Sequence, residues 1–231
     1  MIQIRRSQER GHAEHGWLDS YHTFSFAGYY DPKFMGFRSL RVINQDVIMG
    51  GAGFPTHPHR DMEIITYMIK GTLVHRDSMG HQAKIERGEV QYMSAGTGIT
   101  HSEFNANANT QAELLQIWIV PPKEALPTRY GQKNFKEKFA QNKLVKVLSS
   151  DGSDDSVQIF QNASLYVGWL GPQELILPLA QNRHGWIQVV KGEIEIAGEK
   201  LFAGDALALS EVNNPLLKVL VESEFLFFDL E

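Results

Sequence analysis

Short runs of apolar and β-branched residues, separated by glycine, dominate the chain. Gly71, Gly80 and Gly88 lie between several runs of the first half. Runs that recur roughly every ten residues with turn-forming residues between them are typical of a β-sandwich or β-barrel. No stretch keeps the helical period of about 3.6 residues for long, so the pattern predicts an all-β protein. The first-half runs are residues 41–49, 62–69, 72–77, 82–86, 89–93 and 114–120.

A polar segment interrupts this series. Pro121-Pro122 ends the last run, and the residues that follow are polar and rich in lysine, with a helical turn expected at 134–141. A second series of β-type runs comes next. We therefore expect two jelly-roll-like β-barrel domains in tandem: an N-terminal domain at 1–125, a linker at 126–143 and a C-terminal domain at 144–231. The runs of the second series are residues 157–160, 164–170, 175–179, 185–190, 193–197, 206–210 and 217–228.

The two halves share a local sequence pattern. Residues 67–73 (YMIKGTL) align with residues 188–194 (QVVKGEI), and residues 87–90 (RGEV) align with residues 203–206 (AGDA). In both halves a run ends at Lys-Gly, a hairpin follows, and glycine with an acidic residue opens the next run. Coincidence between two generic hairpins is the alternative explanation. We favour a duplicated barrel.

Composition narrows the function classes. The 231 residues carry a net charge of −5 and no Lys/Arg cluster, which disfavours direct nucleic-acid binding and binding to an anionic membrane surface. The absence of cysteine excludes disulfides, thiolate metal sites and a cysteine nucleophile. No apolar run has the length of a signal peptide or a membrane span, so the cytoplasm is the expected location. The slightly acidic surface gives no reason to expect assembly, and a monomer is expected.

Two pairs of metal-binding residue types stand at i, i+2 spacing. His57-Pro58-His59 follows a glycine-rich turn, and His101-Ser102-Glu103 lies on a later β-type run. Residues i and i+2 of an extended segment point to the same face. Two such pairs facing each other across a barrel interior would form a four-ligand cage. A single His-x-His is common on polar strands, but two such pairs together are far less often accidental.

The residue types indicate which metal the cage would hold. Three neutral imidazoles and a carboxylate suit a divalent transition metal: Fe, Ni, Cu, Co, Mn or Zn. They do not suit calcium, which prefers oxygen ligands. A closed structural site is the alternative, but structural zinc sites usually contain cysteine, whereas catalytic sites keep one position open. The pattern therefore favours a catalytic metal.

The repeat predicts one metal per chain. If no insertion intervenes, the offsets of His57 and His59 from Lys70 lead to Pro178 and Ala180 when counted from Lys191. The offsets of His101 and Glu103 from Gly88 lead to Leu217 and Val219 when counted from Gly204. None of these four residues binds metal, so the C-terminal barrel is expected to be structural.

At these residues the sequence resembles the pirins, a family of bicupin proteins. The first cupin motif reads as Gly51, His57-x-His59, Glu63 and Gly71, and the second as Gly88 through Ser94-Ala95-Gly96 to His101. Spacing departs from the general cupin pattern before Gly71 and before His101, as it does in pirins. The segments HTFSFA (22–27), YYDP (29–32), HPHRDME (57–63) and AGTGITHSE (95–103) are also similar to that family. The resemblance is specific over about residues 10–125, and a degenerate cupin follows.

The resemblance implies a function. It is closest to bacterial pirins with quercetin 2,3-dioxygenase activity, which cleave a flavonol with O₂ to a depside and carbon monoxide. It implies that Glu103, rather than Glu63, is the carboxylate ligand, and we expect Glu103 to act also as the general base for the flavonol hydroxyl. Fe²⁺ is the expected cofactor, with Cu, Ni, Co, Mn and Zn as alternatives.

The sequence also offers candidates for residues that surround the predicted metal site. A flat polyphenol needs an apolar slot, and core packing is the competing explanation for each of its candidate walls. Glu63 is expected to orient a ligand or to pair with Arg60. His75 and His81 flank the Gly80 turn and are expected to be exposed. The candidate walls are Phe54, Tyr67, Phe104 and Trp118, and the histidines not expected to bind metal are His12, His15, His22, His75, His81 and His184.

Three other functions stay open at this point. Animal pirins resemble this protein and act as iron-dependent partners of transcription factors, so a regulatory module without turnover is the second hypothesis. A different cupin chemistry, such as an isomerase or another dioxygenase, is the third. A barrel that only binds a sugar or another small ligand is the fourth.

Overall fold

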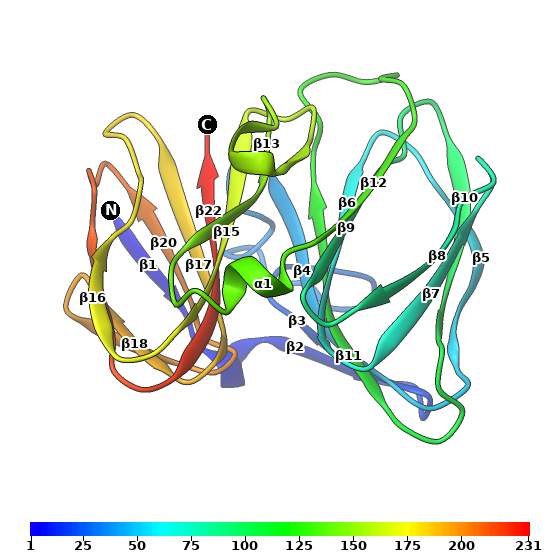
Figure 1. Cartoon of the computed structure of the whole chain (residues 1–231), viewed down its shortest axis with the longest axis horizontal. Helices are drawn as coiled ribbons and strands as arrows, with labels where there is room; N and C mark the ends of the chain where they lie inside the picture. Colours follow the sequence, from blue (N-terminus) through cyan, green and yellow to red (C-terminus); the bar gives the residue numbers. More distant parts are fainter. The chain divides into compact units, whose positions relative to one another are not determined.

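The computed structural model describes all 231 residues, and its regular secondary structure is almost entirely β-strand (Figure 1). Helical structure is limited to α1 (Lys136–Phe139) and two 3₁₀ turns, η1 (Ser7–Glu9) and η2 (Ser153–Asp155). The all-β prediction is confirmed. α1 lies inside the segment where a helical turn was expected. No helix is both long enough and apolar enough to cross a membrane.

The chain divides into two compact units. We call Gly11–Lys136 with Ile159–Gln161 the N-terminal unit. We call Met1–Arg10, Glu137–Gln158 and Asn162–Glu231 the C-terminal unit. The units are not continuous in sequence, whereas the expected domains are, so those domain bounds stay a prediction.

Each unit pairs a seven-stranded sheet with a four-stranded sheet. In the N-terminal unit, the larger sheet has the order β12 (Arg129–Asn134), β9 (Glu89–Ser94), β6 (Glu63–Lys70), β11 (Ala112–Ile119), β4 (Leu40–Ile48), β3 (Leu18–His22), β2 (Gly11–Glu14). The smaller sheet has the order β5 (Gly53–His59), β10 (Ile99–Asn105), β7 (Thr72–Asp77), β8 (Gln82–Glu86).

The C-terminal unit repeats this arrangement. Its larger sheet has the order β1 (Ile2–Arg5), β20 (Ala206–Ser210), β17 (His184–Lys191), β22 (Ser223–Leu230), β15 (Ala163–Leu170), β13 (Val145–Ser149), β14 (Val157–Gln158). Its smaller sheet has the order β16 (Gln173–Ile176), β21 (Leu216–Val219), β18 (Glu193–Ile196), β19 (Glu199–Phe202). The expected run 217–228 thus contains two strands, β21 and β22.

Strand pairing supports the duplication seen in the sequence. The strands β6 to β11 have the same order of pairing as β17 to β22. Gly71 and Gly192 occupy equivalent hairpin turns in the two units. Their φ angles are 79° and 89°, a left-handed conformation that glycine adopts without a Cβ clash. Leu73 pairs with Asn105 in one unit, and Ile194 pairs with Val219 in the other.

That register corrects the ungapped alignment after the second glycine. Since Asn105 corresponds to Val219, Glu103 corresponds to Leu217 and His101 to Pro215. Counting without a gap is therefore wrong by two residues in this segment. The new counterparts are also unable to bind metal, so this correction leaves the prediction of one metal per chain unchanged.

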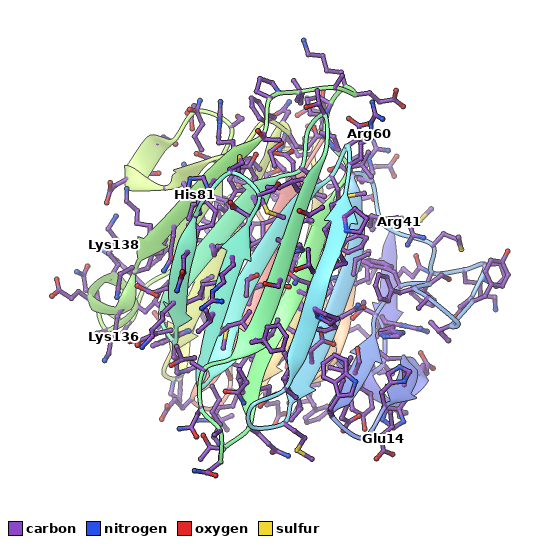
Figure 2. The ribbon with its side chains drawn as sticks, turned by 90° about the vertical axis from the view of Figure 1, so that its right-hand side faces the viewer. Glu14, Arg41, Arg60, His81, Lys136 and Lys138 are labelled. Carbon is purple, nitrogen blue, oxygen red and sulfur yellow. The ribbon has the colours of Figure 1, made fainter.

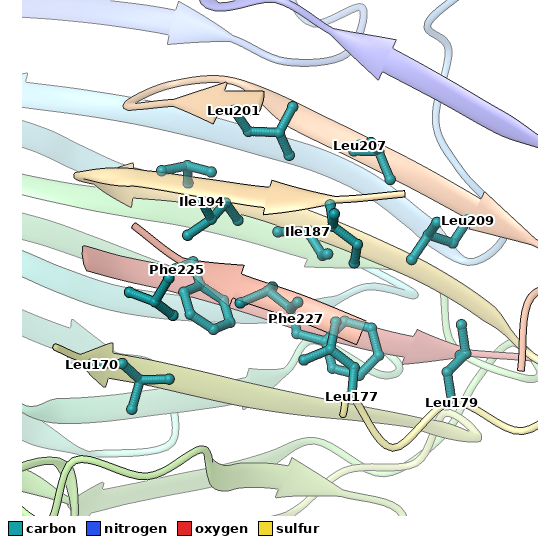
Figure 3. Close-up of a cluster of buried hydrophobic side chains, with 14 residues drawn as sticks. Leu170, Leu177, Leu179, Ile187, Ile194, Leu201, Leu207, Leu209, Phe225 and Phe227 are labelled. Atoms are coloured by element: carbon teal, nitrogen blue, oxygen red, sulfur yellow. The ribbon is translucent and has the colours of Figure 1, made fainter. Parts of the chain in front are cut away.

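The interiors of the two units differ. In the C-terminal unit, one continuous apolar cluster fills the space between the sheets (Figure 3). In the N-terminal unit, two separate clusters contain Ile64 and Met68, and Thr66 lies between these two residues on the same face of β6. The sequence therefore leaves a polar zone in the middle of one barrel only. The labelled members of the C-terminal cluster are Leu170, Leu177, Leu179, Ile187, Ile194, Leu201, Leu207, Leu209, Phe225 and Phe227.

Candidate metal centre

His57 and His59 lie on β5, the edge strand of the smaller sheet. An edge strand tolerates Pro55 and Pro58, which cannot donate to a neighbouring strand. The i, i+2 spacing places both imidazoles on one face, with ring centroids 4.8 Å apart. His57 Nδ1 donates a hydrogen bond to the Pro55 carbonyl over 2.8 Å, which leaves the lone pair of Nε2 for a metal.

His101 comes from the neighbouring strand β10. It is the register partner of His57, and its ring centroid lies 4.4 Å from that of His57 and 4.9 Å from that of His59. The ligand atoms of the three histidines lie within 4.8 Å of one another. The sequence prediction that both segments converge is therefore confirmed for the three histidines.

The electrostatics of the cluster favour neutral imidazoles. Burial, reinforced by the neighbouring His57, lowers the pKa of His59 to about 4. Burial, followed by repulsion from His57 and His59, lowers the pKa of His101 far below its ordinary value. Both rings are therefore neutral near pH 7, the form in which histidine binds a metal.

A metal fits the unsatisfied groups of this cluster. His101 is 2% exposed, and neither of its ring nitrogens has a hydrogen-bond partner. A buried polar group without a partner costs about 1–3 kcal/mol. A divalent transition ion would bind the lone pair of one of these two nitrogens, and three imidazoles are a donor set that such ions prefer.

Glu103 points into the same barrel. Its carboxylate accepts a hydrogen bond from Thr66 Oγ1 over 3.2 Å and one from Gln116 Nε2 over 2.8 Å. Burial is the main cause that raises its pKa to about 7, and the charge of Asp46 adds to the shift. At the same distance limit Glu103 groups with His101 and His75, not with His57 and His59. The complete four-residue cage therefore stays a prediction.

A cavity of about 830 Å³ opens beside the cluster. His57, His59 and Glu103 form part of its wall, as do Phe54 and Trp118. The Trp118 ring contacts His59 edge-on at a centroid distance of 5.0 Å. The cavity thus combines candidate metal ligands with aromatic walls, and two of the four predicted wall residues are confirmed.

The other two predicted wall residues lie elsewhere. Phe104 is 39% exposed, because it follows inward-facing Glu103 on β10 and therefore points outward. Tyr67 is completely buried but follows inward-facing Thr66 on β6, and it does not line the cavity. Strand alternation explains both errors. Three histidines that were not expected to bind metal, His12, His15 and His22, also line the cavity.

The expected role of Glu63 is wrong. Its carboxylate accepts hydrogen bonds from Tyr92 Oη at 2.6 Å and from the backbone N–H groups of Phe160 and Gln161 at 2.7 and 2.9 Å. Strand alternation places Glu63 on the opposite face of β6 from Thr66. Glu63 therefore orients no ligand. Arg60 forms an ion pair with Asp61 instead.

His75 is a further correction. It was expected at the surface but is completely buried, whereas His81 is 42% exposed as expected. β7 alternates, and His75 shares the inward face of Leu73. The same alternation in the sequence could have revealed it. Thr66 and Gln116 were also missed, although each is a polar residue inside an otherwise apolar run.

Comparison with known proteins identifies the family to which the chain belongs. The family profile described as Pirin matches residues 3–119, just over half of the chain. The chain belongs to the pirin family. A second profile, described as the quercetinase C-terminal cupin domain, matches residues 146–230. The resemblance to pirins and the tandem cupin fold are therefore confirmed.

Individual pirins are similar over the whole chain. A quercetin 2,3-dioxygenase of Escherichia coli K12 is 49% identical over 232 residues, which covers 100% of this chain and 99% of that protein. A pirin-like protein of Caulobacter vibrioides is 36% identical over 231 residues, with 99% of each chain covered. The crystal structure of the E. coli pirin YhhW in complex with nickel(II) has 48% identity and a TM-score of 0.95, covering 100% of this chain and 99% of that one. These relatives support the expected quercetinase type of enzyme.

Proposed function

We propose that this pirin is a metal-dependent dioxygenase that cleaves a flavonol such as quercetin with O₂ to a depside and carbon monoxide. The observation that carries the proposal is the aromatic-walled cavity beside the histidine cluster. Its volume of about 830 Å³ lies in the range of small-molecule sites, roughly 300–1,000 Å³. The names of the relatives support the same substrate class. Fe²⁺ is the proposed ion, with Ni, Cu, Co, Mn and Zn as alternatives.

His57, His59, His101 and Glu103 are the proposed ligands. A bound divalent ion would act as a Lewis acid that stabilises the deprotonated 3-hydroxyl of the flavonol. Glu103 is the proposed general base, because it lines the cavity and its raised pKa of about 7 suits proton exchange near neutral pH. Thr66 and Gln116 hold its two oxygens in place.

The remaining hydroxyls of a polyphenol need acceptors. Asn44 and Asp46 supply them from β4, because both are buried and both line the cavity. The Asn44 Oδ1 atom has no hydrogen-bond partner. Trp118 and Phe54 provide flat apolar surface for the rings. The cavity therefore matches a flat molecule with several hydroxyl donors.

Turnover of quercetin by metal-loaded protein tests the proposal. Protein reconstituted separately with Fe²⁺, Ni²⁺, Cu²⁺, Co²⁺ or Mn²⁺ is mixed with quercetin in air. We expect the flavonol absorbance to fade, with one O₂ consumed and one carbon monoxide released per molecule. Glu103→Gln should lower kcat, while Phe104→Ser, outside the cavity, should retain full turnover. Absence of turnover with every ion would contradict the proposal.

A further inference from the structure

His75 has the arrangement of a metal ligand held by a carboxylate. Its Nε2 contacts Asp77 Oδ2 at 3.2 Å. Because a carboxylate only accepts, this contact places the His75 proton on Nε2. Asp77 is itself fixed by the N–H groups of Met79 and His81, at 2.9 and 3.0 Å. A carboxylate that orients a histidine in this way is the usual second layer of a metal site.

The other nitrogen of His75 has no partner. With the proton on Nε2, Nδ1 presents only a lone pair, and this buried atom makes no hydrogen bond. On the neighbouring strand, Glu103 is the register partner of His75. One ligand atom from each of His75, His101 and Glu103 lies within 4.8 Å of the others.

We propose that His75, His101 and Glu103 form a second, inner binding position for a divalent transition ion, separate from the outer His57–His59–His101 position. Two nitrogens and a carboxylate oxygen suit the same metals as the outer position. No single group of ligand atoms within 4.8 Å contains all five residues, and the two groups share only His101, so the two positions are distinct. Because a neutral His101 offers one lone pair, the two positions hold one ion alternately.

The duplicated barrel shows that the fold does not require these polar residues. Counting from the Lys-Gly turns, His75 corresponds to Ile196, and the strand register matches Glu103 with Leu217. Ile196 and Leu217 are also register partners, and they are 1% and 0% exposed. The same two positions therefore pack well as apolar residues. A buried histidine and carboxylate there cost stability unless something satisfies them, and an ion would do so.

The two positions would differ in access to the cavity. His57 and His59 line it, whereas His75 and His101 do not. An ion in the outer position would therefore face the substrate cavity. An ion in the inner position would have one ligand, Glu103, that reaches the cavity wall. The inner position thus serves to retain the ion.

A double variant separates the two positions. His57→Ala/His59→Ala removes the outer ligands from the edge strand and leaves the inner residues intact. We expect this variant to bind close to one Co²⁺ per chain in equilibrium dialysis, more weakly than the wild type. Anomalous diffraction from its Co²⁺-soaked crystals should place the ion about 2.0–2.2 Å from a nitrogen of His75. Adding His75→Gln should reduce the bound Co²⁺ at least tenfold.

The matched control is His81→Gln in the same double variant. His81 also contacts Asp77, but it lies at the surface of the side that carries β5, β10, β7 and β8 (Figure 2). This control should keep the Co²⁺. Failure of the double variant to bind Co²⁺, a bound ion away from His75, or equal binding after His75→Gln would overturn the proposal.

A further measurement applies if the double variant does not fold. In wild-type crystals soaked with Co²⁺, anomalous density should divide between the two positions, and His75→Gln should confine it to the His57 side. A single peak that His75→Gln leaves unchanged would overturn the proposal. All of these readouts locate the ion without quercetin, so their failure is distinguishable from failure of the dioxygenase proposal.

Discussion

Asp46 is a buried carboxyl in the cavity wall, and burial raises its pKa to about 6 despite a hydrogen bond from Ser20 Oγ. The folded protein therefore keeps this proton at a pH where the unfolded chain has released it. The resulting stability is fully present below about pH 4 and is lost as pH rises through about 6. The loss is at most about 3 kcal/mol.

Asp46→Asn should remove this pH dependence from the metal-free protein. We expect the variant to gain stability relative to the wild type between about pH 4 and pH 7, by up to about 3 kcal/mol. Urea unfolding at several pH values measures the difference. Ser20→Ala should have the opposite effect on the wild type, because losing the Ser20 hydrogen bond raises the pKa of Asp46 further. A difference between Asp46→Asn and wild type that does not vary with pH would contradict the assignment.

Replacement of a proposed ligand should lower metal content. Loss of a residue that hydrogen-bonds to a metal ligand typically lowers metal affinity about 10–100-fold, so loss of a direct ligand should lower it at least about 100-fold. Among the four, His101→Ala should have the largest effect, because His101 belongs to both ligand groups. Metal analysis after dialysis measures it. The variants are His57→Ala, His59→Ala, His101→Ala and Glu103→Ala, and the controls at Pro178, Ala180, Leu217 and Val219 should keep their metal.

Strand alternation determines which aromatic side chains face the cavity. Phe54 on β5 lines the cavity, whereas Phe104 on β10 points outward. Phe54→Ser should raise the KM for quercetin about tenfold or more, since burial of an aromatic ring contributes roughly 1.5–3 kcal/mol. Phe104→Ser should change KM less than twofold. Steady-state kinetics of the two variants measure this, and equal effects would refute the orientation of β10.

At the scale of strands, the sequence pattern predicted most of the strands of both units. β7, β8 and β20 have the bounds that the apolar runs indicate. Strands at or near the sheet margins were missed, namely β1, β2, β3, β12, β13 and β19. β2 (GHAE) and β12 (RYGQKN) are rich in polar residues, because strands at a sheet margin are only partly covered by the rest of the protein. Backbone pairing with β3 and β9 stabilises these two strands, and their local sequence carries little signal of that pairing.

The sequence likewise predicted some features of the site and missed others. The i, i+2 spacing was sufficient to bring together His57, His59 and His101. The burial of His75 was not predicted because the adjacent Gly80 turn drew the interpretation toward an exposed loop. The alternation of β7 accounts for that burial, whereas the position of His75 opposite Glu103 depends on the register of β7 against β10, which joins segments far apart in sequence. Long-range register is the information that a single sequence lacks.

At the scale of the whole molecule, the N-terminal residues complete the C-terminal unit. β1 pairs with β20, a partner about two hundred residues away along the chain, from Ile2 opposite Leu209 to Arg5 opposite Ala206. Beyond the strand, Arg6 Nη1 donates to Asp205 Oδ2 over 3.0 Å, and the Ser7 N–H donates to Asp205 Oδ1 over 2.7 Å. The tandem domains expected from the sequence do not predict that the N-terminal strand belongs to the C-terminal unit.

Deletion of residues 1–6 should therefore destabilise the C-terminal unit. Without β1, β20 becomes a sheet edge with unpaired backbone groups. Because each lost hydrogen bond contributes about 0.5–1.5 kcal/mol, we expect a loss of about 2–5 kcal/mol and faster hydrogen exchange at 206–210. Metal content should not change, because every proposed ligand lies in the N-terminal unit. Ile2→Thr keeps the backbone pairing and should retain the exchange protection, so an equal loss in both proteins would show that the Ile2 side chain, rather than the strand, provides the stability.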